Sequence, residues 1–145
     1  MTLSEFIRSL EAVAQRQPSV KMIVENDIFK LNQCADAQYG VFAFVQGQHS
    51  FDIATSLQRF SFSLFFVDRL IEDKSNQIDV QSVAMQTLSN ILLGMEDIAE
   101  VQSGKFQPFN QRFTDDCAGM YCSVEFLVPS SPCEEVFENQ SIKLI

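Results

Sequence analysis

The residues that we consider first for nucleophilic catalysis are the single histidine and the four cysteines. A thiol beside an imidazole base is the arrangement of a cysteine nucleophile, so the pair to consider is His49 with Cys117 or Cys34. Nothing in the sequence near either cysteine indicates an activated thiol, and an ordinary buried cysteine is the common case. We therefore expect no enzyme, and a small Cys/His-dependent enzyme stays as an alternative.

The cysteines and carboxylates are also poorly spaced for a metal ion. Cys117 and Cys122 are separated by an odd number of positions, which on a regular strand places their side chains on opposite faces. Asp115 and Asp116, with Asp68, have the groups for a divalent-cation site or an acid–base pair, but paired acids in a loop are usually just solvated. The five glycines are scattered singly, so there is no glycine-rich phosphate loop. We expect neither a metal nor a cofactor.

Size and charge restrict the class of protein. A chain of 145 residues is the length of one domain with one hydrophobic core. The net charge of -9 and the pI near 4.4 argue against a surface that grips nucleic acid phosphates, which needs local Lys and Arg, although an acidic surface can line a channel through which DNA slides. The start of the chain lacks a signal peptide pattern and no run is long enough to span a membrane, so we expect synthesis in the cytoplasm and reduced cysteines.

Two adjacent segments are expected to form the main folding unit. From position 57 to 66, apolar and mostly polar residues alternate, which predicts a strand whose buried face carries Phe60, Phe62, Leu64 and Phe66. The next segment has apolar residues at spacings of three and four and predicts a helix, with Ser75 or Asn76 as its N-cap. The buried stripe of that helix is expected to comprise Val80, Val83, Ala84, Thr87, Leu88, Ile91, Leu92 and Met95.

The other elements are predicted from shorter patterns. Thr2 and Glu5 form a capping box that begins a helix running to about Gln17, before Pro18. Short extended pieces are expected at 20–25 and 28–31, and a firmer strand at 40–46 should pair with the long strand as a hairpin. Pro108 predicts that the strand at 105–113 is an edge strand or bulged, and alternation resumes at 117–128.

These elements predict an α+β fold, an antiparallel sheet of about four to five strands packed against two helices. We expect a single domain over 1–132, followed by a C-terminal tail or arm over 133–145. The tail mixes glutamates with apolar residues, among them Phe137, Ile142 and Leu144, and such a segment is a candidate arm for a neighbouring subunit. The alternative is a partly disordered terminus.

Several motifs together resemble a known group of proteins. The motifs are Leu3-Ser-Glu-Phe-Ile, Tyr39-Gly-Val-Phe, Phe66-Val-Asp-Arg-Leu-Ile-Glu-Asp and Gln111-Arg-Phe-Thr-Asp-Asp-Cys-Ala-Gly-Met-Tyr. The chain, to about Cys133, resembles small tail-terminator or neck-ring proteins of tailed bacteriophages that infect Bacteroides-type bacteria, including the crAss-like phages. The resemblance implies a virion protein whose copies form a closed ring at the head-to-tail junction or along the tail, beside portal, neck or tail proteins, with genomic DNA passing through the lumen.

The resemblance also implies where copies touch. The motif from Arg112 to Tyr121 is the best candidate for a fold-defining or intersubunit element, with Arg112 free to pair with Asp115 or Asp116 of the same or an adjacent chain. The alternative is a surface salt bridge worth under about 1 kcal/mol. With the tail residues, this gives the candidate interface as Arg112, Asp115, Asp116, Tyr121, Phe137, Ile142 and Leu144. A competing hypothesis is a monomeric adaptor that binds another protein through its C-terminal arm.

Overall fold

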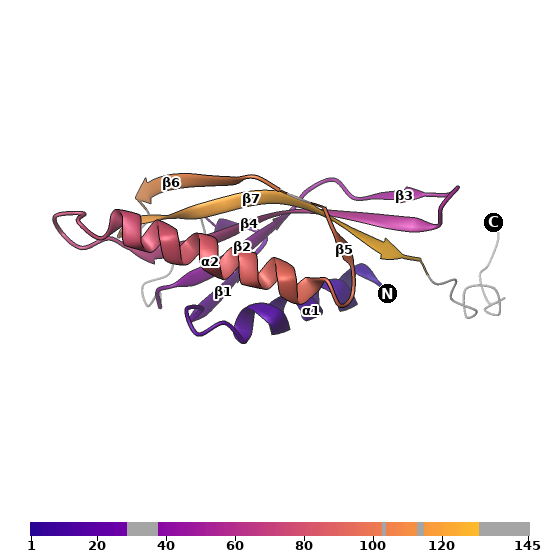
Figure 1. The fold of residues 1–145 in the computed structure, drawn as a ribbon, viewed down its shortest axis with the longest axis horizontal. Coiled ribbons are helices and arrows are strands. Elements are labelled where there is room, and N and C mark those ends of the chain that lie inside the picture. Colours follow the sequence, from indigo (N-terminus) through magenta and orange to yellow (C-terminus); the bar gives the residue numbers. More distant parts are fainter. Residues whose placement is uncertain (29–37, 103, 113–114, 131–145) are drawn as a thin grey trace, which may run out of the picture.

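In the computed structural model, the described residues are 1–28, 38–102, 104–112 and 115–130, with Gln111 and Arg112 described by their backbone alone. Over these ranges the chain forms two helices and a mixed sheet of seven strands (Figure 1). In chain order the elements are α1 (Leu3–Gln15), β1 (Met22–Glu25), β2 (Val41–Gln46), β3 (Ser50–Asp52), β4 (Leu57–Arg69), α2 (Gln77–Met95), β5 (Glu100–Val101), β6 (Phe106–Arg112) and β7 (Asp116–Pro129).

The sheet is built on the antiparallel pair β4 and β7. Their register runs from Leu57 opposite Pro129 to Arg69 opposite Cys117. On one side β4 pairs with β2 and, further along, with β3, while on its far side β7 pairs with β5 and β6. Only β1 is parallel to its neighbour, β2. The expected α+β class is confirmed, but the predicted count of four to five strands was too low and the sheet is mixed rather than wholly antiparallel.

Alternation along β4 and β7 divides their side chains between the two faces of the sheet. Phe60, Phe62, Leu64 and Phe66 are buried on one face, as the pattern predicted. From β7, the even-numbered residues from Cys122 to Val128 are buried in the same cluster. Because both strands contribute to one face, a continuous apolar surface is available for the helices to cover.

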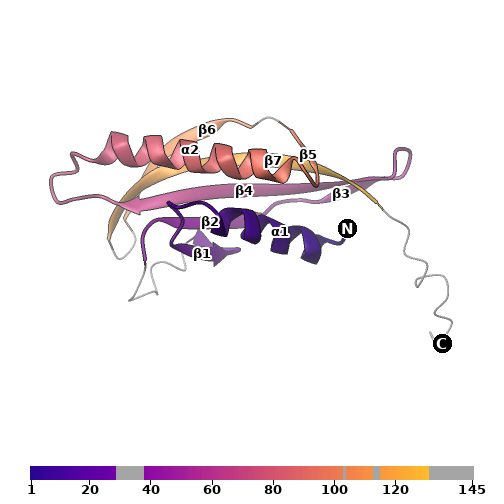
Figure 2. The same cartoon turned by 60° about the horizontal axis from the view of Figure 1, so that its bottom comes forward.

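Both helices pack on that face (Figure 2), where α2 lies over β4 and β7 and against α1. The hydroxyl oxygen of Thr2 accepts from the backbone N–H of Glu5 at 3.1 Å, so the predicted N-cap of α1 is confirmed, although the helix ends at Gln15. The ring centroid of Phe6 from α1 lies 5.1 Å from that of Phe60 and 4.9 Å from that of Phe126. Phe6 therefore packs among the aromatic rings of β4 and β7.

The predicted stripe of α2 is buried for the most part. Val80, Ala84, Thr87, Leu88, Ile91 and Met95 are buried, but Val83 is 45% exposed and was wrongly included. Val83 lies about 60° to 100° around the helix from the centre of the stripe, where it borders the chain after α1 instead of the sheet. Asn76 is the N-cap residue by position, but its side chain donates to the backbone oxygen of Arg69 at the end of β4 and accepts from the backbone N–H of Ile71 in the following loop.

Two further expectations can be compared with the structure, and others fall outside the described residues. The strand at 40–46 does pair antiparallel with β4, but the connection between them holds β3, so the direct hairpin partner of β4 is β3. Pro108 lies in β6, which pairs with β7 alone among the described strands and is an edge strand there, as predicted. The extended piece expected at 28–31 falls almost wholly outside the described residues, as does the tail at 133–145.

Candidate functional site

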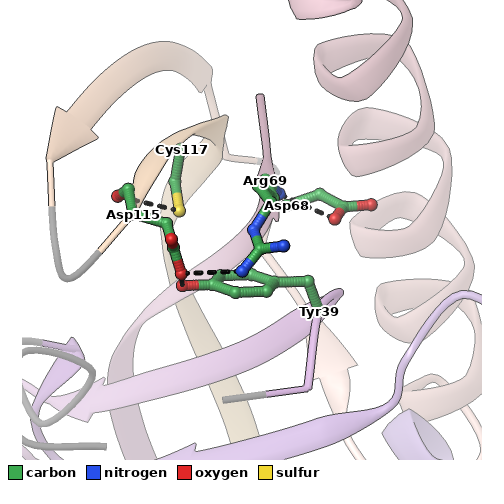
Figure 3. Close-up of polar contacts among 5 residues, drawn as sticks. All are labelled: Tyr39, Asp68, Arg69, Asp115 and Cys117. Carbon is green, nitrogen blue, oxygen red and sulfur yellow. Dashed lines mark hydrogen bonds and ion pairs between the residues drawn. The ribbon is translucent and has the colours of Figure 1, made fainter. Parts of the chain in front are cut away.

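A cluster of polar side chains lies at the end of the sheet where β4 ends and β7 begins (Figure 3). Arg69 is the last residue of β4 and stands opposite Cys117, the second residue of β7. Asp115 immediately precedes β7, and Tyr39 precedes β2. Three separate parts of the chain therefore meet at this point, and two of the residues flagged in the sequence, Asp115 and Cys117, are among them.

The carboxylate of Asp115 is the centre of the cluster. Its Oδ2 accepts a hydrogen bond from the Tyr39 hydroxyl and forms an ion pair with Arg69 Nη2, each at 3.1 Å. The guanidinium carbon of Arg69 lies 5.3 Å from the centroid of the Tyr39 ring, a cation–π distance. The hydrogen bond from Arg69 lowers the pKa of Asp115, while burial, above all, raises the pKa of Tyr39.

The thiol of Cys117 is kept in its protonated form by these surroundings. Its side chain is buried and its Sγ donates to the backbone oxygen of Asp115 at 3.5 Å. Burial raises the pKa of this thiol to about 11, so the thiolate that a nucleophile requires is scarce at neutral pH. The arrangement holds structure together, and it does not activate the sulfur.

The acidic set considered from the sequence is not assembled. Asp68 belongs to the opposite face of β4 from the cluster, and Figure 3 shows its carboxylate pointing away from Asp115. Its Oδ1 accepts instead from the backbone N–H of Arg69 at 2.7 Å. Asp116 is exposed at the start of β7. Among the residues that the structure describes, no three His, Cys, Asp or Glu side chains are grouped so that they could hold a metal ion.

His49 lies far from Cys117. Its Nδ1 accepts from the backbone N–H of Ser61 at 3.1 Å, so Nε2 carries the proton and donates to Gln46 Oε1 at 3.0 Å. Ser61 and Arg69, the residue opposite Cys117, are eight positions apart on β4, or roughly 26 Å along the strand. Burial against the core lowers the pKa of His49. The imidazole therefore joins the turn to the strand, and the other thiol considered with it, Cys34, lies outside the described residues.

The expectations for Cys117 and Cys122, that they are reduced and on opposite faces of the strand, agree with the structure. Cys117 and Cys122 are both free and both buried, and they belong to different clusters on opposite faces of the sheet. Strand alternation predicted this separation, which prevents the two sulfurs from binding one metal ion together.

The interface residues implied by the resemblance are placed only in part. Asp115 is bound by Arg69, a partner that the sequence did not indicate. The backbone of Arg112 pairs with that of Asp116 across β6 and β7, and the side chain of Arg112 lies outside the described part of the chain. Phe137, Ile142 and Leu144 also lie outside it. Their contribution to an interface stays a prediction.

Tyr121 lies on the sheet face that no described helix covers. Its ring stacks on Phe65 with centroids 5.6 Å apart and contacts Phe109 at 6.0 Å. On the same face, Arg59 and Glu125 form an ion pair at 2.6 Å between exposed side chains. This face therefore combines a half-buried aromatic group with polar and charged side chains.

Large apolar side chains are exposed at several places on the described surface. Two are on the β3–β4 hairpin, one is in the loop before α2, and four are on α2 itself, whose only charged residue is Asp79. The exposed fractions are 54% for Phe51, 84% for Ile53, 52% for Ile71, 79% for Ile78, 45% for Val83, 47% for Met85 and 64% for Leu93. The spacing of apolar residues predicted the buried stripe of α2 but not these exposed side chains, although the sequence from 80 to 95 contains no charged residue.

No helix within the described ranges is long and apolar enough to cross a membrane. A scan against models of protein families found no family that matches the chain, and a search of curated proteins found no matching sequence.

Proposed function

We propose that this chain is a non-enzymatic structural subunit that assembles with copies of itself into a closed ring, at the head-to-tail junction or along the tail of a tailed bacteriophage. Genomic DNA passes through the lumen of that ring, and portal, neck or tail proteins lie against it. The assembly part of the proposal is supported by the structure's exposed apolar surfaces, and the place in a virion is supported by the sequence resemblance alone.

The single observation that carries the proposal is that apolar side chains are exposed on two unlike surfaces. One surface is the β3–β4 hairpin with Phe51 and Ile53, and the other is the outer side of α2 with Ile78, Met85 and Leu93. Exposed apolar patches mark protein contacts when they are larger than scattered single residues. When two different surfaces of one protein pair with each other, the contact is head to tail and yields a ring if the rotation closes.

The charge of the chain suits a lumen for DNA. The formal net charge is -9, with 19 acidic residues against 10 Lys and Arg. Binding of duplex DNA requires basic side chains that displace counterions from the phosphates, and an acidic wall lacks them. A ring of this composition would let DNA pass without holding it.

Electron microscopy of the purified protein in negative stain tests this function. Rings with a central hole wide enough for duplex DNA are expected, because a closing head-to-tail contact gives particles of one size. Particles that are single subunits, both alone and after mixing with isolated neck or tail rings, would contradict the proposal.

A further inference from the structure

The register of β4 with β2 differs by one residue from its register with β3. Gln46 at the end of β2 stands opposite Phe62, and Ser50 at the start of β3 stands opposite Arg59. The chain between them, 47–49, therefore has one residue more than the part of β4 that it faces, 60–61. An extra residue on one strand of an antiparallel pair is a β-bulge, and it interrupts the hydrogen bonds of the ladder.

The imidazole of His49 supplies a hydrogen bond that the bulge interrupts. The backbone N–H of Gly47 donates to the oxygen of Ser61 at 2.8 Å, while the N–H of Ser61 donates to His49 Nδ1 at 3.1 Å. In a regular antiparallel pair, the two backbones would exchange both bonds. The strands stay close here, because a Cβ atom at position 47 would lie 3.3 Å from the oxygen of Ser61. A side-chain nitrogen therefore takes the place of a backbone oxygen in the ladder.

The ring can accept this bond only in its neutral form. Its Nε2 carries the proton and donates to Gln46 Oε1 at 3.0 Å, and the amide of Gln46 donates in turn to Asn26 Oδ1 at 3.1 Å. These two bonds leave the lone pair of Nδ1 for the N–H of Ser61. A second proton would occupy Nδ1, and two N–H groups would then face each other. Protonation of His49 therefore breaks the bond to Ser61.

The surroundings of the ring keep it neutral at neutral pH. Its centroid lies 5.6 Å from that of Phe60 and 5.5 Å from that of Phe62. The charged groups on the neighbouring elements are Glu25 and Asp27 on either side of Asn26, Asp52 in β3 and Arg59 in β4, which is paired with Glu125. Burial lowers the pKa of His49 from its ordinary 6.5. The bond to Ser61 is therefore made at neutral pH and is lost in acid.

We propose that the bulge at 47–49 is a pH-sensitive hinge, in which neutral His49 joins the start of β3 to β4 and protonation of the ring frees the β3–β4 hairpin to change its angle. Among the described strands, β3 pairs with β4 alone, so the bulge is the point where the hairpin meets the rest of the sheet. The hairpin extends beyond both helices (Figure 1 and Figure 2). The hinge belongs to the single chain and is present whether or not copies assemble.

The hinge also makes the stability of the protein fall in acid. The unfolded chain takes up a proton at His49 near pH 6.5, and the native chain takes it up only at a lower pH. The stability that the neutral ring contributes is therefore complete above pH 6.5 and is lost as the pH falls through the native pKa.

Hydrogen exchange of the Ser61 amide, followed by NMR between pH 7.5 and pH 5, tests the hinge in the wild-type chain. Protection factors remove the effect of pH on the exchange chemistry itself. We expect the protection of Ser61 to fall at least about tenfold, because an amide without an acceptor exchanges by local opening. The fall should follow the titration of the His49 ring, read from its nitrogen shifts in the same samples. Phe65, opposite Ala43 in the regular part of the ladder, is the reference and should keep its protection.

Two substitutions separate the hydrogen bond from the proton. Asparagine carries an oxygen as many bonds from the backbone as Nδ1 is, and it does not titrate, so His49→Asn should keep Ser61 protected at both pH values. His49→Leu fills a similar space without an acceptor and should leave Ser61 poorly protected at both. A ring that only fills space would give the opposite result, with protection kept in His49→Leu and lost in His49→Asn.

Several results would overturn the hinge. One is a Ser61 amide whose protection stays constant while His49 titrates, and another is a His49 ring that remains neutral down to pH 5. A loss of protection in His49→Asn equal to that of the wild type would also exclude it. If Phe65 loses protection in parallel with Ser61, the whole sheet opens in acid and the bulge is not the point that yields.

Discussion

Asp115 contacts three other residues, two through its carboxylate and one through its backbone oxygen. Arg69 and Tyr39 both reach its Oδ2, and the thiol of Cys117 reaches its backbone oxygen. A carboxylate that already has a cation and a hydroxyl donor is poorly placed to bind a metal ion or to transfer a proton. At the scale of residues, the cluster therefore joins the end of β4, the start of β7 and the segment before β2.

Thiol labelling tests the inert state of the described cysteines. Cys117 and Cys122 are buried, and burial raises the pKa of each thiol to about 11. We predict that neither is alkylated by iodoacetamide at pH 8 in the native protein, and that both are alkylated after unfolding in guanidinium. Peptide mapping by mass spectrometry assigns the sites. Rapid native alkylation of Cys117 would instead indicate an activated thiol.

Glu11 of α1 faces Glu25 of β1, and this pair makes stability depend on pH. A hydrogen bond between the two side chains, followed by burial and by the charge of Glu25, raises the pKa of Glu11 to about 7 from an ordinary 4.5. Between these values the native chain keeps a proton that the unfolded chain loses. The stabilisation is complete below pH 4.5 and is lost as the pH rises through 7.

Replacement of Glu11 by Gln tests this pH dependence. The amide donates a hydrogen bond at every pH, so the variant should unfold at a higher temperature than the wild type at pH 8 and at a similar temperature at pH 5. Thermal unfolding followed by circular dichroism at both pH values gives the comparison. A constant difference between the two proteins across this range would show that the pair does not titrate there.

The carboxylate cluster could not be predicted from the sequence because its members are distant along the chain. Asp115 is separated by 46 positions from Arg69 and by 76 from Tyr39. Periodicity reports which face a side chain takes and not which remote side chain it meets. The sequence did place Cys117 and Cys122 on opposite faces, since that depends only on alternation within one strand.

At the scale of elements, the sheet is built around the paired strands β4 and β7. Each is long enough for alternation to be read from the sequence, and the buried face of β4 was predicted correctly. The two short strands β3 and β5 have three and two residues, too few for any period to appear. The parallel pairing of β1 depends on the course of the chain between β1 and β2, which local patterns do not specify.

The close approach of β4 and β7 at Gly119 gives a prediction for this scale. Gly119 stands opposite Val67, and a Cβ atom at this position would overlap the backbone carbonyl of Phe66. We predict that Gly119→Ala destabilises the protein by about 1–3 kcal/mol, because a strand backbone must move to admit the methyl group. Urea unfolding gives the free energy.

Ser123→Ala is the matched control for Gly119→Ala. Ser123 is exposed on the same strand, and its hydroxyl makes only a long 3.4 Å contact with Ser63. Its substitution is expected to change the free energy of unfolding by less than about 0.5 kcal/mol. Equal effects at the two positions would show that the strand pair tolerates a wider spacing than the structure has.

At the scale of the whole molecule, one face of the sheet is covered by α1 and α2, and α2 in turn exposes an outer surface with a single charge. The formal net charge of the chain is -9, and copies with the same net charge repel each other. Surfaces without charged side chains do not add to this repulsion. The proposed self-assembly would use the exposed apolar side chains of the hairpin and of α2. The sequence suggested assembly through a resemblance and a C-terminal arm, and the structure adds exposed surfaces that local patterns did not reveal.

The mass of the purified wild-type chain in solution, measured by light scattering coupled to size exclusion, tests the central claim of self-assembly most directly. A closed ring predicts a mass that is a fixed whole-number multiple of 16.4 kDa and does not grow with concentration. A filament would give a mass that rises with concentration. A mass of 16.4 kDa at every attainable concentration would contradict the account.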